Sequence, residues 1–223
     1  PIQTSSTFRR AISQKEYVEG VVAEYEAAYN TTLRPLTTTG QSTEPPNPDD
    51  LPRVSAPTQA RTSVGGAGYA VNASRADGAH GYGRISQFLD KWNDWAEDEL
   101  RHFMSSLKAT ADYALTLTSE GDLWSECFIG LYVDANHNKK PPCKADDGHM
   151  VTVEGVLGTF MGMDWSKKKQ GIVATNSGES ESVAWSRAIK TAIKWAAVME
   201  KTTTNAVQIR GYNDNEAVRI AFT

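Results

Sequence analysis

The sequence predicts an α/β fold: a mixed β-sheet with flanking helices in the C-terminal half, preceded by a mainly helical segment. Three observations support this prediction. The continuous apolar run at residues 127–133 is typical of a central, buried strand. Residues 180–201 place apolar side chains at spacings of three and four, which indicates an amphipathic helix. A further apolar stretch at residues 207–212 follows this helix, so a strand–helix–strand crossover is expected.

Residues 1–120 are expected to form the helical segment. Residues 8–29 predict a helix, with Ser13 as its N-cap and Glu16 completing a capping box. Residues 37–62 are rich in Thr, Ser, Pro and Asp, which indicates a long linker or loop. Two more helical patterns follow, and they cover residues 65–89 and 94–107.

Residues 121–223 are expected to form the α/β domain. Three consecutive strands suggest a meander, and the strand–helix–strand that follows suggests a crossover. The expected strands are residues 127–133, 150–161, 172–174 and 207–212, with the helix at 180–201 before the last strand and a short helix after Asp214.

Composition narrows the class of protein. The 223 residues carry a net charge of −4, which argues against binding nucleic acid through overall charge but allows a local basic patch. No run of about 20 apolar residues is present, so no membrane partner is expected. The two cysteines, Cys127 and Cys143, form no disulfide framework, so an intracellular protein, cytoplasmic or nuclear, is expected. Because the chain starts at Pro1 rather than Met, we expect a fragment of a longer product.

Three carboxylates occupy informative positions. Asp134 ends the first apolar strand, Glu181 lies in the first turn of the long helix, and Asp214 follows the last strand. If those two strands are neighbours, the three side chains can meet at one end of the sheet. Clustered carboxylates repel one another and usually need a cation, and hard oxygen ligands suit Mg²⁺ or Mn²⁺. Acidic residues are also common there as turn residues and at helix starts, so the spacing alone leaves both interpretations open.

Short segments between about Ile12 and Phe222 resemble, in order and spacing, motifs of copia-type retrotransposon polyproteins. The matches are Ile12–Tyr17 with "LSQ..Y", Arg75–Asp77 and Arg84–Leu89 with "TRPDI…AVS.LSRF", Ser106–Leu115 with "RYLKGT.DYGL", Val133–Ala135 with "TDADW", Asp164–Gln170 with "SWKSKKQ", Ser177–Glu181 with "SSTEAEY" and Asn213–Asn215 with "CDN".

The resemblance implies the C-terminal part of a reverse transcriptase. Residues 121–223 would then be a ribonuclease H-like domain that cuts RNA in RNA–DNA hybrids with two Mg²⁺ (or Mn²⁺) ions, held by Asp134, Glu181 and Asp214. Glu179 remains an alternative to Glu181. Residues 1–120 would be the thumb and connecting region, and the rest of the Pol polyprotein would be a partner. The resemblance also allows Lys167, Lys168 and Lys169 to contact phosphates of the hybrid, the alternative being a solvated hairpin.

Departures from the family pattern leave an alternative function open. Asn136 and His137 replace an Asp and a Trp, and "RPDI" reads Arg-Ala-Asp-Gly. We expect the domain to be truncated, because the family's fourth acid lies beyond Thr223, and no polymerase active site is expected because the polymerase aspartates lie upstream. The alternative is therefore an inactive transposon remnant that keeps the fold and nucleic-acid binding. An integrase-like member of the same superfamily is a further, weaker alternative.

Overall fold

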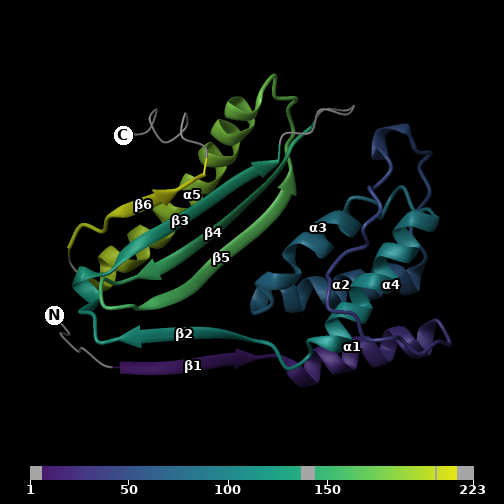
Figure 1. Cartoon of the computed structure of the whole chain (residues 1–223), viewed down its shortest axis with the longest axis horizontal. Helices are drawn as coiled ribbons and strands as arrows, with labels where there is room; N and C mark the ends of the chain where they lie inside the picture. The colour runs from purple at the N-terminus through teal and green to yellow at the C-terminus, as the bar shows by residue number, and fades with distance from the viewer. Residues whose placement is uncertain (1–6, 137–143, 204, 215–223) are drawn as a thin grey trace. The chain divides into compact units, whose positions relative to one another are not determined.

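The computed structural model of the chain describes residues 7–136, 144–203 and 205–214 (Figure 1). The chain divides into two compact units. One contains residues 12–115, and the other contains residues 1–11 together with residues 116–223. The division therefore falls near residue 115 rather than after residue 120, and the beginning of the chain belongs with its C-terminal part.

The unit of residues 12–115 is helical. Its helices are α1 (Lys15–Ala28), α2 (Thr58–Ala73), α3 (Ala79–Ser86) and α4 (Asp94–Ala109), with 3₁₀ turns η1 (Pro48–Asp50) and η2 (Ala76–Gly78). These helices form because each has an apolar face of helical period. On α1, for example, Val18, Val21, Val22 and Tyr25 are all buried in a shared core. The Asn93 side chain caps α4 by accepting a hydrogen bond from the Ala96 backbone N–H.

Two predictions for this part of the chain were wrong in detail. Residues 8–13 are not helical, because Thr7–Ser13 form strand β1, and Gln14 rather than Ser13 is the N-cap of α1. The predicted 65–89 helix is two helices separated by η2, and the first of them already begins at Thr58, inside the predicted loop. Pairing of β1 with strand β2 (Ala114–Glu120) supplies backbone hydrogen bonds that outweigh the local helical pattern.

The other unit is built on a six-stranded sheet in the order β1-β2-β5-β4-β3-β6. Strand β3 (Phe128–Asn136) follows the 3₁₀ turn η3 (Trp124–Glu126) and pairs antiparallel with β4 (Asp146–Glu154), which pairs antiparallel with β5 (Phe160–Lys169). Helix α5 (Ser177–Thr203) then leads to β6 (Ile209–Tyr212), which pairs parallel with β3. This meander followed by a crossover confirms the predicted α/β class, a mixed sheet with flanking helices consistent with a ribonuclease H-like fold.

The strands differ from the prediction at the β4–β5 hairpin. A turn at residues 155–159 interrupts the predicted strand 150–161, and the third strand of the meander is β5 rather than residues 172–174. The Asp122 carboxylate fixes this turn by accepting hydrogen bonds from the backbone N–H groups of Leu157 and Thr159. Gly158 adopts φ +112°, a conformation that favours glycine. The predicted helix after Asp214 lies outside the described residues.

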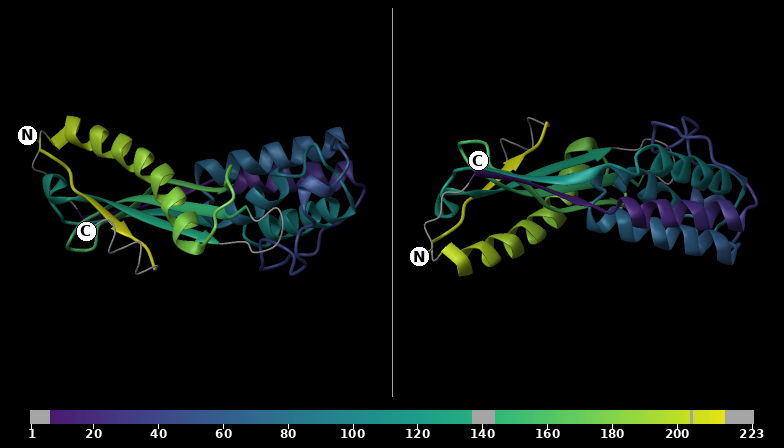
Figure 2. Two further views of the ribbon diagram at one scale, coloured as in Figure 1. Left: turned by 90° about the horizontal axis from the view of Figure 1, so that it is seen from above. Right: turned by 90° about the horizontal axis from the view of Figure 1, so that it is seen from below.

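Helix α5 lies along one face of the sheet (Figure 2). It presents Ala184, Ala188, Ala192 and Ala196, spaced four residues apart, to the buried side chains of β3 and β4. Small side chains let the helix backbone approach the strands closely, and this fixes where the first turn of α5 lies. In the described part of the chain, no helix is long and apolar enough to cross a membrane.

Candidate metal centre

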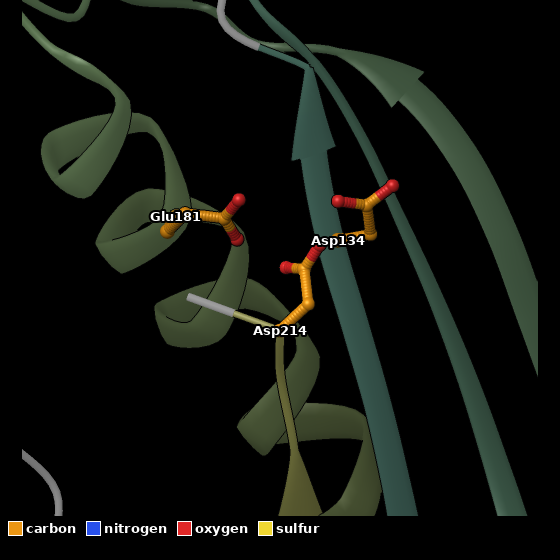
Figure 3. A group of neighbouring side chains, drawn as sticks. All are labelled: Asp134, Glu181 and Asp214. Atoms are coloured by element: carbon orange, nitrogen blue, oxygen red, sulfur yellow. The ribbon is translucent and has the colours of Figure 1, made fainter. Parts of the chain in front are cut away.

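The parallel pairing of β3 with β6 brings two distant aspartates to one end of the sheet. Tyr212 is level with Tyr132 in the register, so Asp214 follows β6 at the level where Asp134 lies on β3. Strand β6 ends at Tyr212, and the next residue, Asn213, bridges the end of β3 and the first turns of α5. Glu181 reaches this end of the sheet from α5, and the three carboxylates converge (Figure 3).

One carboxylate oxygen from each of Asp134, Glu181 and Asp214 lies within 4.8 Å of the other two. Asp134 and Asp214 are exposed, whereas Glu181 is buried. Three hard, anionic oxygen donors at this separation could hold a divalent cation of the Mg²⁺ or Mn²⁺ type. The exposed sides of the two aspartates face the solvent. The three residues predicted from the sequence therefore lie together as expected.

Glu181 is the most constrained member of the cluster. Burial raises its pKa above the ordinary value, and the charges of Asp134 and Asp214 raise the pKa further. Hydrogen bonds from the Asn213 side chain and from the Ala135 backbone N–H act in the opposite direction, because they stabilise the ionised form. The effect of burial is the largest, so the net shift of the Glu181 pKa is upward. A cation bound nearby would favour the ionised form of this carboxylate.

The structure also separates the two glutamates that the sequence left as alternatives. Glu179 accepts hydrogen bonds from the backbone N–H (2.6 Å) and the hydroxyl (2.7 Å) of Thr175. Its own backbone N–H donates to Asn176 Oδ1 at 2.9 Å. This reciprocal arrangement caps the start of α5, and it lowers the pKa of Glu179. Glu179 is therefore occupied in helix capping, whereas Glu181, two residues on, belongs to the carboxylate cluster.

A buried polar network holds the first turns of α5 against the sheet. Gln170 Nε2 donates to the Ser180 backbone oxygen at 2.7 Å, and its backbone N–H donates to the Ala145 oxygen at 2.7 Å. About two helical turns further along, Arg187 pairs with the buried Asp147 on β4. In the sequence, Gln170 stands out only as the last residue of the segment that resembles "SWKSKKQ". Its role became visible only once β5 and α5 were placed side by side.

The three consecutive lysines do not share one surface. They lie on β5, where side chains alternate between the two faces of the sheet. Lys167 is opposite Gly148, which is opposite Asp134, so Lys167 and Lys169 share the face of Asp134 whereas Lys168 lies on the α5 face. Two strand spacings separate Asp134 from Lys167, roughly 10 Å. Lys167 also pairs with Asp146 at 3.1 Å.

A shallow pocket of about 560 Å³ lies on the sheet face opposite α5, next to the carboxylates. Asp134 and Asp214 themselves line it, together with Gly148, Tyr132 and Tyr212. The two rings stack with centroids 4.7 Å apart, and the Tyr132 hydroxyl donates to Glu154 Oε1 at 2.8 Å. The tyrosine pair was not predicted from the sequence. Each tyrosine precedes an aspartate of the cluster by two residues, however, and side chains two residues apart on a strand lie on the same face.

No protein-family model matches the sequence, and no curated protein sequence matches it.

Proposed function

We propose that residues 121–223 act as a metal-dependent ribonuclease of the ribonuclease H type, which cleaves the RNA strand of RNA–DNA hybrids. The chain would belong to a reverse transcriptase of the copia-type retrotransposon class. The observation that carries the proposal is the convergence of Asp134, Glu181 and Asp214 within 4.8 Å. These are the residues that the family resemblance assigns to the metal site, and they come from three separate elements of a fold of the matching class.

The donor set fits the cations that this chemistry needs. Three carboxylates supply hard oxygen ligands, and the repulsion among them is relieved by a bound divalent cation. Mg²⁺ ions bound there would make an attacking water more acidic and stabilise the negative charge on the departing 3′ oxygen of a phosphodiester. In this proposal the fold keeps Asp134 and Asp214 exposed to solvent and holds the buried Glu181 in place through its hydrogen bond from Asn213.

The surroundings of the cluster support a nucleic-acid substrate. The pocket beside Asp134 is open and lined by two tyrosines, so a sugar–phosphate backbone could lie across it. Lys167 and Lys169 lie on the same sheet face; Lys167 is paired with Asp146, and Lys169 would contact phosphates on one side of the cluster. The net charge of −4 does not oppose this proposal, because bound metal ions rather than overall charge would hold the scissile phosphate.

The test is cleavage of a labelled RNA–DNA hybrid by the 223-residue chain in Mg²⁺. Asp134→Asn should reduce the rate by at least about 100-fold, because removing a direct metal ligand costs more than the 10–100-fold typical of an outer-shell change. Glu179→Gln is the matched control. It also replaces a glutamate at the start of α5 but keeps an oxygen acceptor for the cap, so it should cleave like the wild type.

Two results would contradict the proposed function. Equal rates for wild type and Asp134→Asn would reject the site. A wild-type chain that binds the hybrid but does not cleave it in Mg²⁺ or Mn²⁺ would favour the non-catalytic remnant. Since RNA is the strand cut, an all-DNA duplex of the same sequence should remain intact throughout.

A further inference from the structure

Asn213 makes two hydrogen bonds that together span the carboxylate cluster. Its Nδ2 atom donates to the Glu181 Oε2 atom at 2.9 Å and to the Val133 backbone oxygen at 2.9 Å. Val133 directly precedes Asp134, and Asn213 itself directly precedes Asp214. One side-chain amide therefore joins the strand that carries Asp134, the helix that carries Glu181 and the segment that carries Asp214.

We propose that Asn213 is a positioning residue that holds the three carboxylates in a metal-binding arrangement before any cation arrives. This proposal rests on the metal centre of the proposed function and deepens it. The Asn213 amide nitrogen donates to two oxygen acceptors, one on β3 and one on Glu181. It acts through the groups that it holds.

The physical need for such a residue follows from electrostatics. Without a cation, repulsion drives the three carboxylates apart, and Asp214 is the most easily displaced because it lies beyond the last residue of a four-residue strand. A bond from the neighbouring residue to the β3 backbone prevents this displacement. A second bond to Glu181 fixes the rotamer of a buried side chain that would otherwise be pushed away from Asp134.

The chemistry of the side chain suits this role. An amide NH₂ group carries two hydrogens and can donate to two acceptors at once, which a hydroxyl cannot do. A preorganised donor set binds a metal more tightly because less free energy is spent on ordering the ligands. Partners that orient metal ligands typically contribute 10–100-fold in metal affinity.

The experiment compares Mn²⁺ binding by four forms of the full chain, with free Mn²⁺ measured by electron paramagnetic resonance. Asn213→Ala removes the amide, and Asn213→Leu removes both donors while keeping the side-chain volume. Asn93→Ala is the matched control, because Asn93 also makes two local hydrogen bonds but lies at the start of α4, in the helical unit. Both Asn213 variants should bind Mn²⁺ about 10–100-fold more weakly, and Asn93→Ala should bind like the wild type.

A kinetic readout separates positioning from a merely structural effect. In hybrid cleavage, the Mg²⁺ concentration needed for half-maximal rate should rise by the same factor in both Asn213 variants. The rate at saturating Mg²⁺ should stay close to that of the wild type, because excess metal reassembles the ligands. Folding of each variant without metal is checked by circular dichroism, and Asn213→Leu provides the measurement if the smaller residue destabilises the strand.

Each outcome has a distinct meaning. Wild-type Mn²⁺ affinity in both Asn213 variants would overturn the positioning role and leave the proposed nuclease standing. Recovery of affinity in Asn213→Leu alone would also overturn it, since the residue would then only fill space. A wild-type chain that binds no Mn²⁺ at all would remove the metal centre itself, and with it the proposed function.

Discussion

Replacing Asp134 with Asn should make the metal-free chain more stable and abolish its response to metal. Asp134 belongs to two of the three carboxylate pairs in the cluster, so the substitution removes two of the three repulsive interactions. The amide keeps the size of the side chain, and Asp134 is exposed, so packing should change little. A gain in stability coupled to a loss of metal binding is the pattern expected of a site that keeps unfavourable charges together for a purpose.

The size of the effect follows from the geometry. Two unit charges 4.8 Å apart in surroundings as polar as water repel each other by about 0.9 kcal/mol. Two pairs give about 2 kcal/mol, and the exposure of Asp134 and Asp214 to solvent ions screens part of this repulsion, so the expected gain is about 1–2 kcal/mol. In a chain of this length, 1 kcal/mol moves the thermal midpoint by about 2–4 °C, so the metal-free variant should melt about 2–8 °C higher.

Adding Mn²⁺ should raise the thermal midpoint of the wild type but not that of Asp134→Asn. At a Mn²⁺ concentration ten times the dissociation constant, binding stabilises the wild type by about 1.4 kcal/mol, or about 3–6 °C. The variant keeps only two carboxylates and should shift hardly at all. Thermal unfolding followed by circular dichroism at low ionic strength measures all four midpoints. The Glu179→Gln chain is the control and should respond to Mn²⁺ as the wild type does.

Two results would refute the reasoning. An equal Mn²⁺ shift in wild type and Asp134→Asn would show that the cation does not bind at this cluster. A metal-free variant less stable than the wild type would show that the Asp134 carboxylate makes a favourable interaction that outweighs the repulsion.

Three further predictions concern the framework around the site. Gly211→Ala should destabilise the sheet unit by about 1–3 kcal/mol in urea unfolding, because the added methyl group meets the Trp185 ring of α5. The variant should also bind Mn²⁺ more weakly, because the clash displaces β6 just before Asp214. An unchanged urea midpoint would mean that the strand has room to move. Glu26→Gln should cost about 1 kcal/mol at pH 7, because the hydrogen bond from Lys108 lowers the Glu26 pKa below its ordinary value of 4.5. That stabilisation is present above pH 4.5 and is lost as the pH falls through the lowered pKa of Glu26. The urea midpoints of variant and wild type should therefore converge in acid. A difference that stays constant with pH would contradict the ion-pair explanation. Burial raises the pKa of the Cys127 thiol to about 11, so roughly one molecule in a thousand carries the thiolate at pH 8, and peptide mapping after iodoacetamide treatment should find Cys127 unmodified until the chain unfolds.

The sequence was sufficient to predict strands β3 and β6 and helix α5 between them, and to name the three acids as candidates, whereas β1 and β2 were not predicted. The apolar run before Asp134 and the periodic pattern of α5 are local signals, and both predicted elements are present with shifted ends. Asp134 and Asp214 could be recognised as candidates because each follows an apolar strand segment. Local patterns predicted these features because burial of a strand or of one helix face is encoded in consecutive residues.

Only the tertiary structure could decide the features that depend on pairing between distant residues. Residues 8–13 follow a helical pattern but form β1, since a neighbouring strand more than 100 positions away takes up their hydrogen bonds. The choice of Glu181 over Glu179 depends on which turn of α5 faces the end of β3, and the roles of Lys167 and Lys168 depend on the register of β5. The sequence marked Asn213 only as the first residue of the segment that resembles "CDN", with no role of its own. Its importance comes from two oxygen atoms, 32 and 80 residues away, that meet it only when β3, α5 and β6 are assembled.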